Sequence, residues 1–339
     1  MEVKRGLRGE EALRQQGNGG IQIQQQGGRR QVEAEMLMSM NSYNLQPDMS
    51  LYITSLNSGS NGNCYYIGND EEGIFVDAGI SCRETEKRMK RLGLSMDKVK
   101  AIFVSHEHSD HISGIPVLAK KYRLPVYITE GTLRHGRMDL ARELVIPFAA
   151  YEAVRIGGIS VTAFPKFHDA SDPHSFIVAS STVRVGVFTD IGKACAHVIN
   201  HFQHCHAAFL ETNYDEEMLM NGRYPASLKN RIKGGHGHLS NAQALELFKL
   251  YRPSFMSHLL LAHLSKDNNN PQLVKDLFDQ HTSNTSIVVA SRFEETAVYH
   301  IQSSGEMLGE IKRPVEPVAP AFVLSKPKRR PNDQQLSLF

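Results

Sequence analysis

One segment of eleven residues, AIFVSHEHSDH at positions 101–111, constrains the fold of this chain more than any other. Its first part is apolar, as expected of a buried strand, and its second part is a polar loop with four candidate ligands, His106, His108, Asp110 and His111. Imidazole nitrogens and carboxylate oxygens are the ligands that borderline divalent metals prefer. We therefore predict a strand that ends in a site for two adjacent metal ions. The alternative is a polar turn in which the histidines are incidental.

Short β-rich runs alternate with helical segments on both sides of this loop, between residues 51 and 303. Ser240 and Gln243 form a capping box at the start of one helical run, AQALELFKLY. Asn270 and the proline after it open another, PQLVKDLFDQ. The pattern predicts a single α/β domain over residues 50–303.

The segments outside this domain differ from it in composition. Residues 1–49 are rich in Gln, Gly and Arg, and we expect a disordered low-complexity arm because they bury too little apolar surface to offset the loss of backbone entropy. Met49 leaves open the alternative that translation starts there. Residues 304–339 are rich in Pro and Lys and predict an extended tail.

Composition also limits the cellular environment that we expect. The chain contains no run of about 18 apolar residues, which argues against a membrane span. Its four cysteines lack the spacing of a disulfide scaffold or a CxxC pair, so we expect reduced thiols and a cytoplasmic protein with no membrane partner. The net charge of +2 gives no global sign of nucleic-acid binding, so any basic surface must be local.

The HxHxDH run after a strand resembles the signature of the metallo-β-lactamase superfamily, and the other elements of that pattern follow in order. They are Asp77 in FVDAG, His168 in KFHDA, Asp190 in VFTDIG and His263 in LLLAHLS. The resemblance implies an αββα sandwich. It also implies that His106, His108 and His168 bind one metal ion, that Asp110, His111 and His263 bind the other, that Asp190 bridges both, and that Asp77 orients the histidine loop. His258 competes for the last ligand position, although a core histidine is the favoured interpretation.

Finer motifs narrow the resemblance within this superfamily. The runs SLNSGSNGNCYYI, HDASDPHSF, LETNYDEEML, GHLSNAQA and HLSKDNN resemble the YycJ group of bacterial enzymes, also called WalJ or VicX, over residues 51–303. That group is regarded as DNA exonucleases linked to DNA repair. The resemblance implies a DNA substrate and two divalent ions, Zn²⁺ or Mn²⁺, with iron as a third candidate. The stretch 191–262 is too short for the extra domain of larger nucleases, so core loops must hold the substrate.

Three further features have two interpretations each. His238 lies just before a helix, and we assign it to the scissile phosphate or to protonation of the leaving oxygen; the alternative is a helix-entry histidine without chemistry. The glycine-rich loop over 58–63 offers amides to a phosphate or is only a tight connection. The histidines around Cys205 suggest another metal site, but we expect a solvated or dipole-complementing cluster at a helix end.

The last five residues, QLSLF, resemble the QLxLF peptide with which bacterial replication and repair proteins bind the DNA sliding clamp. The resemblance implies that Gln335 hydrogen-bonds to the clamp while three apolar side chains fill its pockets, those of Leu336, Leu338 and Phe339. The alternative is that this peptide packs onto the core of its own enzyme. The prediction is thus a metal-dependent DNA exonuclease with catalytic residues Asp110 and His238. Hydrolysis of a small ester, thioester or cyclic nucleotide and a noncatalytic clamp-binding adaptor remain as alternatives.

Overall fold

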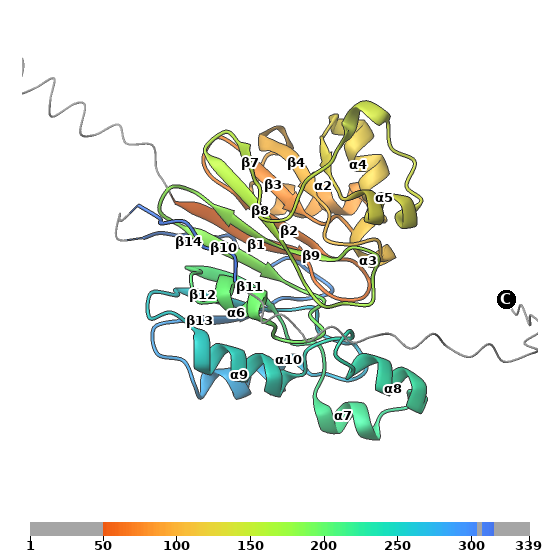
Figure 1. Cartoon of the computed structure of the whole chain (residues 1–339), viewed down its shortest axis with the longest axis vertical. Coiled ribbons are helices and arrows are strands. Elements are labelled where there is room, and N and C mark those ends of the chain that lie inside the picture. Colours follow the sequence, from red (N-terminus) through yellow and green to blue (C-terminus); the bar gives the residue numbers. More distant parts are fainter. Residues whose placement is uncertain (1–49, 304–306, 315–339) are drawn as a thin grey trace, which may run out of the picture. The chain divides into compact units, whose positions relative to one another are not determined.

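The computed structural model describes residues 50–303 and 307–314. The predicted N-terminal arm over 1–49 and the predicted clamp-binding residues 335–339 lie outside this part of the chain. The described chain forms two seven-stranded sheets that are flanked by helices, as Figure 1 shows. The predicted α/β class with an αββα sandwich is therefore confirmed. Within the described chain, no helix has the length and apolar character needed to cross a lipid bilayer.

The first sheet contains the strands of the N-terminal half and one C-terminal strand. Its order is β14-β1-β2-β3-β4-β5-β6. Pairing is antiparallel from β14 to β3 and parallel from β3 to β6. The strands are β1 (Leu51–Asn57), β2 (Cys64–Gly68), β3 (Gly73–Val76), β4 (Val99–Phe103), β5 (Val126–Tyr127), β6 (Val145–Ile146) and β14 (Tyr299–Ile301).

The second sheet has the order β13-β12-β11-β10-β9-β8-β7. The strands from β13 to β10 are parallel, and those from β10 to β7 are antiparallel. They are β7 (Ala153–Ile156), β8 (Ile159–Pro165), β9 (His174–Ala179), β10 (Arg184–Phe188), β11 (Ala207–Glu211), β12 (His258–Ala262) and β13 (Ser286–Val289).

The main core lies between the two sheets. Alternate side chains of β8, including Val161, are buried against the first sheet because successive residues of a strand point to opposite faces. Aromatic pairs join the sheets: the rings of Tyr65 and Phe209 are 4.8 Å apart, and those of Phe103 and Phe176 are 5.8 Å apart. Such pairs bury large apolar areas and fix the spacing of the layers.

Helices bury the outer faces of both sheets. The first sheet is covered by α2 (Cys82–Arg91), α4 (Ile115–Tyr122) and α5 (Glu130–Gly136), with the short helices η1 (Met96–Lys98) and η2 (Arg142–Leu144) between strands. The second sheet is covered by α6 (Ala196–Phe202), α9 (Asn241–Tyr251) and α10 (Pro271–Asp279). The predicted caps are confirmed, because Ser240 and Gln243 form a capping box on α9 and Asn270 accepts two amide hydrogen bonds at the start of α10.

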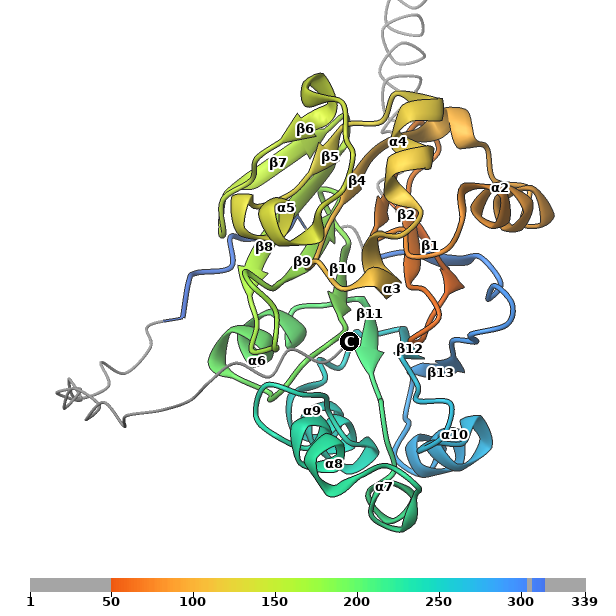
Figure 2. The same cartoon turned by 90° about the vertical axis from the view of Figure 1, so that its right-hand side faces the viewer.

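The topology places the candidate site residues at one edge of the sandwich, as Figure 2 shows for the strands that end there. Asp77 follows β3, the HxHxDH loop follows β4, Asp190 follows β10, and His263 follows β12. Parallel strands end at the same edge of a sheet, so residues that are distant in sequence meet there. The remaining helices, α3 (Ser109–Ile112), α7 (Glu216–Asn221) and α8 (Ala226–Ile232), follow β4 and β11.

Candidate metal centre

The structure brings all seven predicted metal ligands together at this edge. One group contains His106, His108 and His168, and another contains Asp110, His111 and His263; within each, the candidate ligand atoms lie within 4.8 Å of one another. Asp190 connects the groups. Its Oδ2 is 3.1 Å from His111 Nε2, and its Oδ1 is 3.7 Å from His168 Nε2 and 3.4 Å from His263 Nδ1.

Asp77 lies directly behind the HxHxDH loop and is fully buried. Its two carboxylate oxygens accept hydrogen bonds from Ser105 N and Ser105 Oγ, both at 2.8 Å. One oxygen also accepts from His111 Nδ1 at 2.7 Å. A histidine that donates through Nδ1 presents Nε2 in a fixed direction, so this carboxylate orients the ring of His111 toward Asp190.

The same arrangement recurs in three other histidines. His168 Nδ1 donates to the carbonyl of Gly237 at 3.1 Å, and His106 Nδ1 lies 2.9 Å from Ser105 Oγ. His263 Nδ1 donates to Glu211 Oε1 at 2.9 Å. In each ring the second nitrogen is therefore left for another partner.

Three buried atoms of the cluster have no hydrogen-bond partner within the described chain: His106 Nε2, His263 Nε2 and Asp190 Oδ2. Asp190 Oδ2 lies 3.1 Å from His111 Nε2, and His263 Nε2 lies 3.4 Å from Asp110 Oδ2, but neither contact has hydrogen-bond geometry. Buried polar atoms without partners are rare because desolvation is costly. A divalent cation satisfies nitrogen and carboxylate donors together, so these residues fit a metal centre.

The cluster concentrates negative charge in a buried space. Burial alone lowers the pKa of a histidine, but Asp190, Asp110 and Asp77 raise the pKa of His111 well above its usual range. Burial likewise opposes the shift at His263, where Asp190, Asp110 and Glu211 raise the pKa to about 10. Without a metal, protons on these rings neutralise the carboxylates.

Glu211, at the end of β11, was not predicted from the sequence. It is fully buried, and its Oε1 accepts hydrogen bonds from His238 Nδ1 at 2.8 Å and His263 Nδ1 at 2.9 Å. Its Oε2 accepts from the amides of Ile191 and Leu239. Burial raises the pKa of a carboxyl group, but His238 and His263 lower that of Glu211 to about 2. The sequence signal that could have identified Glu211 as a site residue was a carboxylate at the end of the apolar strand AAFLE.

His238 lies at the solvent side of the cluster, with 21% of its side chain exposed. Its ring is 5.3 Å from those of His168 and His263. The hydrogen bond to Glu211 fixes Nδ1 as a donor and directs Nε2 elsewhere. The predicted phosphate-contacting residue is thus adjacent to the candidate ligands, and it also falls into one group of four with Asp190, Glu211 and His263.

Three site residues have left-handed backbone conformations. The φ angles of Asp77, Asp190 and His263 are 58°, 55° and 56°. Residues with a β-carbon rarely adopt such angles, although Asp and His tolerate them better than most. Each follows the end of a strand, where this conformation turns the side chain into the cluster.

The glycine-rich loop over 58–63 supports the HxHxDH segment. The amides of Ser58, Gly59, Gly62 and Asn63 all donate to protein acceptors, which favours the interpretation as a structural connection over a phosphate cradle. Asn63 N donates to the Asp110 carbonyl at 2.7 Å, and Asn63 Nδ2 lies 3.2 Å from Asp110 Oδ2. The loop therefore positions Asp110.

Three histidines near Cys205, His197, His201 and His206, are buried, so the prediction of a solvated cluster is wrong for them. The alternative of a dipole-complementing cluster is not contradicted, because His201 Nδ1 and His204 Nδ1 lie 2.7 and 2.8 Å from the carbonyl oxygens of His197 and Asn200 at the end of α6. His201 stacks on Phe164 at 4.0 Å, and burial lowers its pKa to about 4. None of them belongs to a possible metal group in the described chain. His258 also lies outside these groups, but it is half-buried rather than a core residue.

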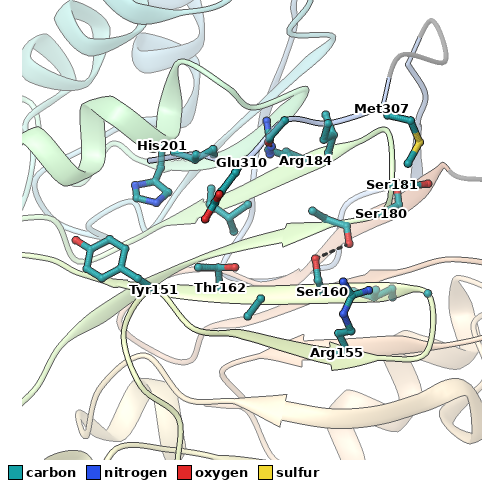
Figure 3. A pocket seen from close by; sticks show the side chains of 18 of the residues that line it. Tyr151, Arg155, Ser160, Thr162, Ser180, Ser181, Arg184, His201, Met307 and Glu310 are labelled. Atoms are coloured by element: carbon teal, nitrogen blue, oxygen red, sulfur yellow. Dashed lines mark hydrogen bonds between the residues drawn. The ribbon is translucent and has the colours of Figure 1, made fainter. Parts of the chain in front are cut away.

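A separate cavity of about 590 Å³ lies over β7–β10 and is bounded by the segment 307–313 (Figure 3). Figure 3 shows Ser160 and Thr162 of β8 and Arg184 of β10 in its lining, with His201 of α6 at one end. Leu308 N donates to the Ser181 carbonyl at 3.0 Å, so the segment is attached to the β9–β10 turn. None of the candidate metal ligands lines this cavity.

Comparisons with known proteins agree with this geometry. Residues 73–264 match the family model described as the beta-lactamase superfamily domain. The chain is 36% identical to exodeoxyribonuclease YycJ of Bacillus anthracis, covering 73% of this chain and 94% of that protein. It is 30% identical to exodeoxyribonuclease WalJ of Streptococcus pneumoniae strain D39, covering 64% and 83%. The metallo-beta-lactamase fold protein YhfI of Bacillus subtilis superposes with a TM-score of 0.58 at 15% identity, covering 74% and 99%.

Proposed function

Because the chain belongs to the metallo-β-lactamase superfamily, and within it to the group of YycJ and WalJ, we propose that this metal-dependent hydrolase is a phosphodiesterase that shortens DNA from an end. The observation that carries the proposal is the pair of ligand groups joined by Asp190, with unpartnered buried atoms in both. The relatives named exodeoxyribonucleases supply the substrate class.

In this proposal the first group of histidines would hold one divalent ion, and Asp110, His111 and His263 would hold a second. Asp190, whose oxygens lie near ligand atoms of both groups, would be shared between the two ions. When bound, the ions supply Lewis acidity that makes water nucleophilic at neutral pH and offsets charge on the phosphate. Zn²⁺ and Mn²⁺ suit the donor set, and iron is the third candidate.

Side chains of this protein then orient the histidine rings and protonate the leaving oxygen. Asp77 fixes the ring of His111, and Glu211 fixes those of His238 and His263. With Nδ1 held by Glu211, His238 directs Nε2 toward the substrate and donates a proton to the leaving oxygen. Asp110 completes the second ligand group and is held by Asn63.

The proposal is tested by assaying purified, metal-loaded protein on end-labelled DNA, end-labelled RNA and a thioester. We expect DNA to be shortened from an end. Asp110→Ala and His111→Ala should each abolish this activity while circular dichroism shows a folded protein, because the two side chains serve the site. Full activity in either variant contradicts the two-ion assignment, and preference for the thioester or for RNA contradicts the proposed substrate.

The recruitment part of the proposal concerns QLSLF, whose placement the structure does not describe. Its support is the sequence resemblance alone, and it connects the enzyme to DNA repair or replication in the cytoplasm. A tethered enzyme gains a high local concentration at its substrate without a strongly basic surface. Deletion of residues 335–339 should abolish binding to the purified sliding clamp and leave hydrolysis of short oligonucleotides intact. Unchanged clamp binding by the deletion variant contradicts it.

A further inference from the structure

A cavity of about 430 Å³ adjoins the candidate metal centre. The loops that follow β1, β12 and β13 form its walls, which include Ser58 and Leu264. Leu264 directly follows His263, and Ser58 Oγ accepts a hydrogen bond from the backbone amide of His263 at 2.7 Å. The cavity thus lies beside the backbone of His263, one residue of the second ligand group, although none of the seven candidate ligands lines it. Its volume is in the range of about 300–1,000 Å³ that is typical of small-ligand sites.

Phe293 lines this cavity and is 76% exposed. This ring is the most exposed of the large apolar side chains among the described residues, so its face is available to a ligand. A ring at the rim of a cavity offers a flat face on which a nucleobase can stack. Stacking is tolerant of sequence because every base has such a face, and this suits an enzyme that removes successive nucleotides.

The neighbouring Arg292 is held in a fixed orientation with one nitrogen unused. Its Nη2 donates to Ser60 Oγ at 3.0 Å and to Asn61 Oδ1 at 3.2 Å. Its Nη1 is buried and has no hydrogen-bond partner among residues 50–303 and 307–314. The guanidinium group lines the cavity, and its planar set of N–H donors matches the oxygens of a phosphate well.

The charge of the lining also favours a phosphate. Lys266 and Arg292 contribute two positive charges, and Glu294 contributes one negative charge. We propose that this cavity is a nucleotide subsite for a single DNA strand, in which the base stacks on Phe293 and the phosphate binds Arg292. The strand must be single, because a paired and stacked base cannot reach the ring. This inference rests on the proposed function, since it states where that substrate is held.

The first test compares two substrates of the metal-loaded enzyme. Methyl p-nitrophenyl phosphate is a phosphodiester whose one aromatic ring is the leaving group and which has no second phosphate, so it cannot place a ring or a phosphate in the subsite while its own phosphate is at the metal centre. Phe293→Ala should lower the ratio of kcat/KM for single-stranded DNA to kcat/KM for this diester by about 5- to 100-fold, the range expected for one lost stacking contact. Phe293→Trp should keep the ratio near the wild-type value. Phe255→Ala is the matched control, because Phe255 is 52% exposed but does not line the cavity.

The second test measures binding of an intact fluorescent strand to the Asp110→Ala protein over a range of salt concentrations. Adding Arg292→Gln should reduce the slope of log K against log salt by about 0.7, as expected for the loss of one phosphate contact on a single strand. Adding Phe293→Ala should weaken binding and leave that slope unchanged, because stacking releases no counterions.

These outcomes separate the inference from the function on which it rests. A wild-type enzyme that hydrolyses the small diester but does not shorten DNA contradicts the proposed function. If the wild-type enzyme shortens DNA while Phe293→Ala leaves the substrate ratio unchanged and Arg292→Gln leaves the salt slope unchanged, only the nucleotide subsite is overturned.

Discussion

At the scale of single residues, His238 differs from the histidines of the two predicted ligand groups because it belongs to neither of them. His238→Ala should lower turnover by roughly 10²-fold or more, in the range of general acid catalysis. Metal content should stay at the wild-type level, as measured by plasma mass spectrometry. Loss of metal from this variant would make His238 a ligand instead of a proton donor.

Glu211 positions both His238 and His263, so its replacement should have a wider effect. Glu211 Oε1 accepts hydrogen bonds from two histidines, and Oε2 accepts them from two backbone amides. In Glu211→Gln one of these oxygens is replaced by an NH₂ group, which cannot accept a hydrogen bond. We expect activity and metal affinity to fall by roughly 10- to 100-fold, as for other residues that orient ligands. Glu217→Gln, the same change on the exposed first turn of α7, is the control. If Glu211→Gln keeps the wild-type metal affinity, His263 does not need Glu211 to hold its position.

At the scale of elements, the turn after β3 packs directly against α3. A β-carbon on Gly79 would lie 1.7 Å from the Asp110 carbonyl oxygen and 2.8 Å from Asn63 N. Gly79→Ala must therefore push α3 away, at a cost of about 1–3 kcal/mol in the free energy of unfolding. Denaturant unfolding should show this loss together with reduced metal content, because Asp110 and His111 move. Gly235→Ala, where a β-carbon meets no atom within 4 Å, should change neither.

The elements were also what sequence patterns predicted best. Alternation of apolar residues located the strands, and the caps at Ser240 and Asn270 located two helices, because both signals act within a few residues. Glu211 was missed because its partners lie 27 and 52 positions away, and only the meeting of β11 with β12 brings them together. His197 of α6 was misjudged for the same reason, since its partner Tyr151 lies 46 positions away.

At the scale of the whole molecule, metal binding should contribute to the stability of the fold. Ligand binding at 100 times the dissociation constant adds about 2.7 kcal/mol, so removal of the ions by a chelator should lower Tm by about 5–10 °C. Differential scanning fluorimetry with EDTA, followed by addition of Mn²⁺ or Zn²⁺, measures both the loss and its recovery. An unchanged Tm after confirmed metal loss would show that the site is not linked to folding.

The metal-free protein should also depend on pH in a defined direction. The pKa of His263 is raised to about 10 in the fold, so its protonated form stabilises the fold below the ordinary pKa of about 6.5. This contribution is lost as the pH rises from about 6.5 through 10. The Tm of chelated protein should therefore fall between pH 6.5 and pH 9, relative to that of the metal-loaded protein over the same range. A parallel course of the two curves would contradict this.

The left-handed backbone at Asp77, Asp190 and His263 has a consequence for laboratory evolution of this enzyme. Glycine fits that conformation best, so at these three codons a selection for heat resistance and a selection for hydrolysis choose different amino acids. A library selected for heat resistance in the presence of a chelator should accumulate glycine and asparagine there. The same library selected with metal present should retain aspartate and histidine, because the bound ions then stabilise the variants that can hold them. Deep sequencing of the two pools would therefore identify the residues on which metal binding depends, both the ligands Asp190 and His263 and the orienting residue Asp77, without an activity assay.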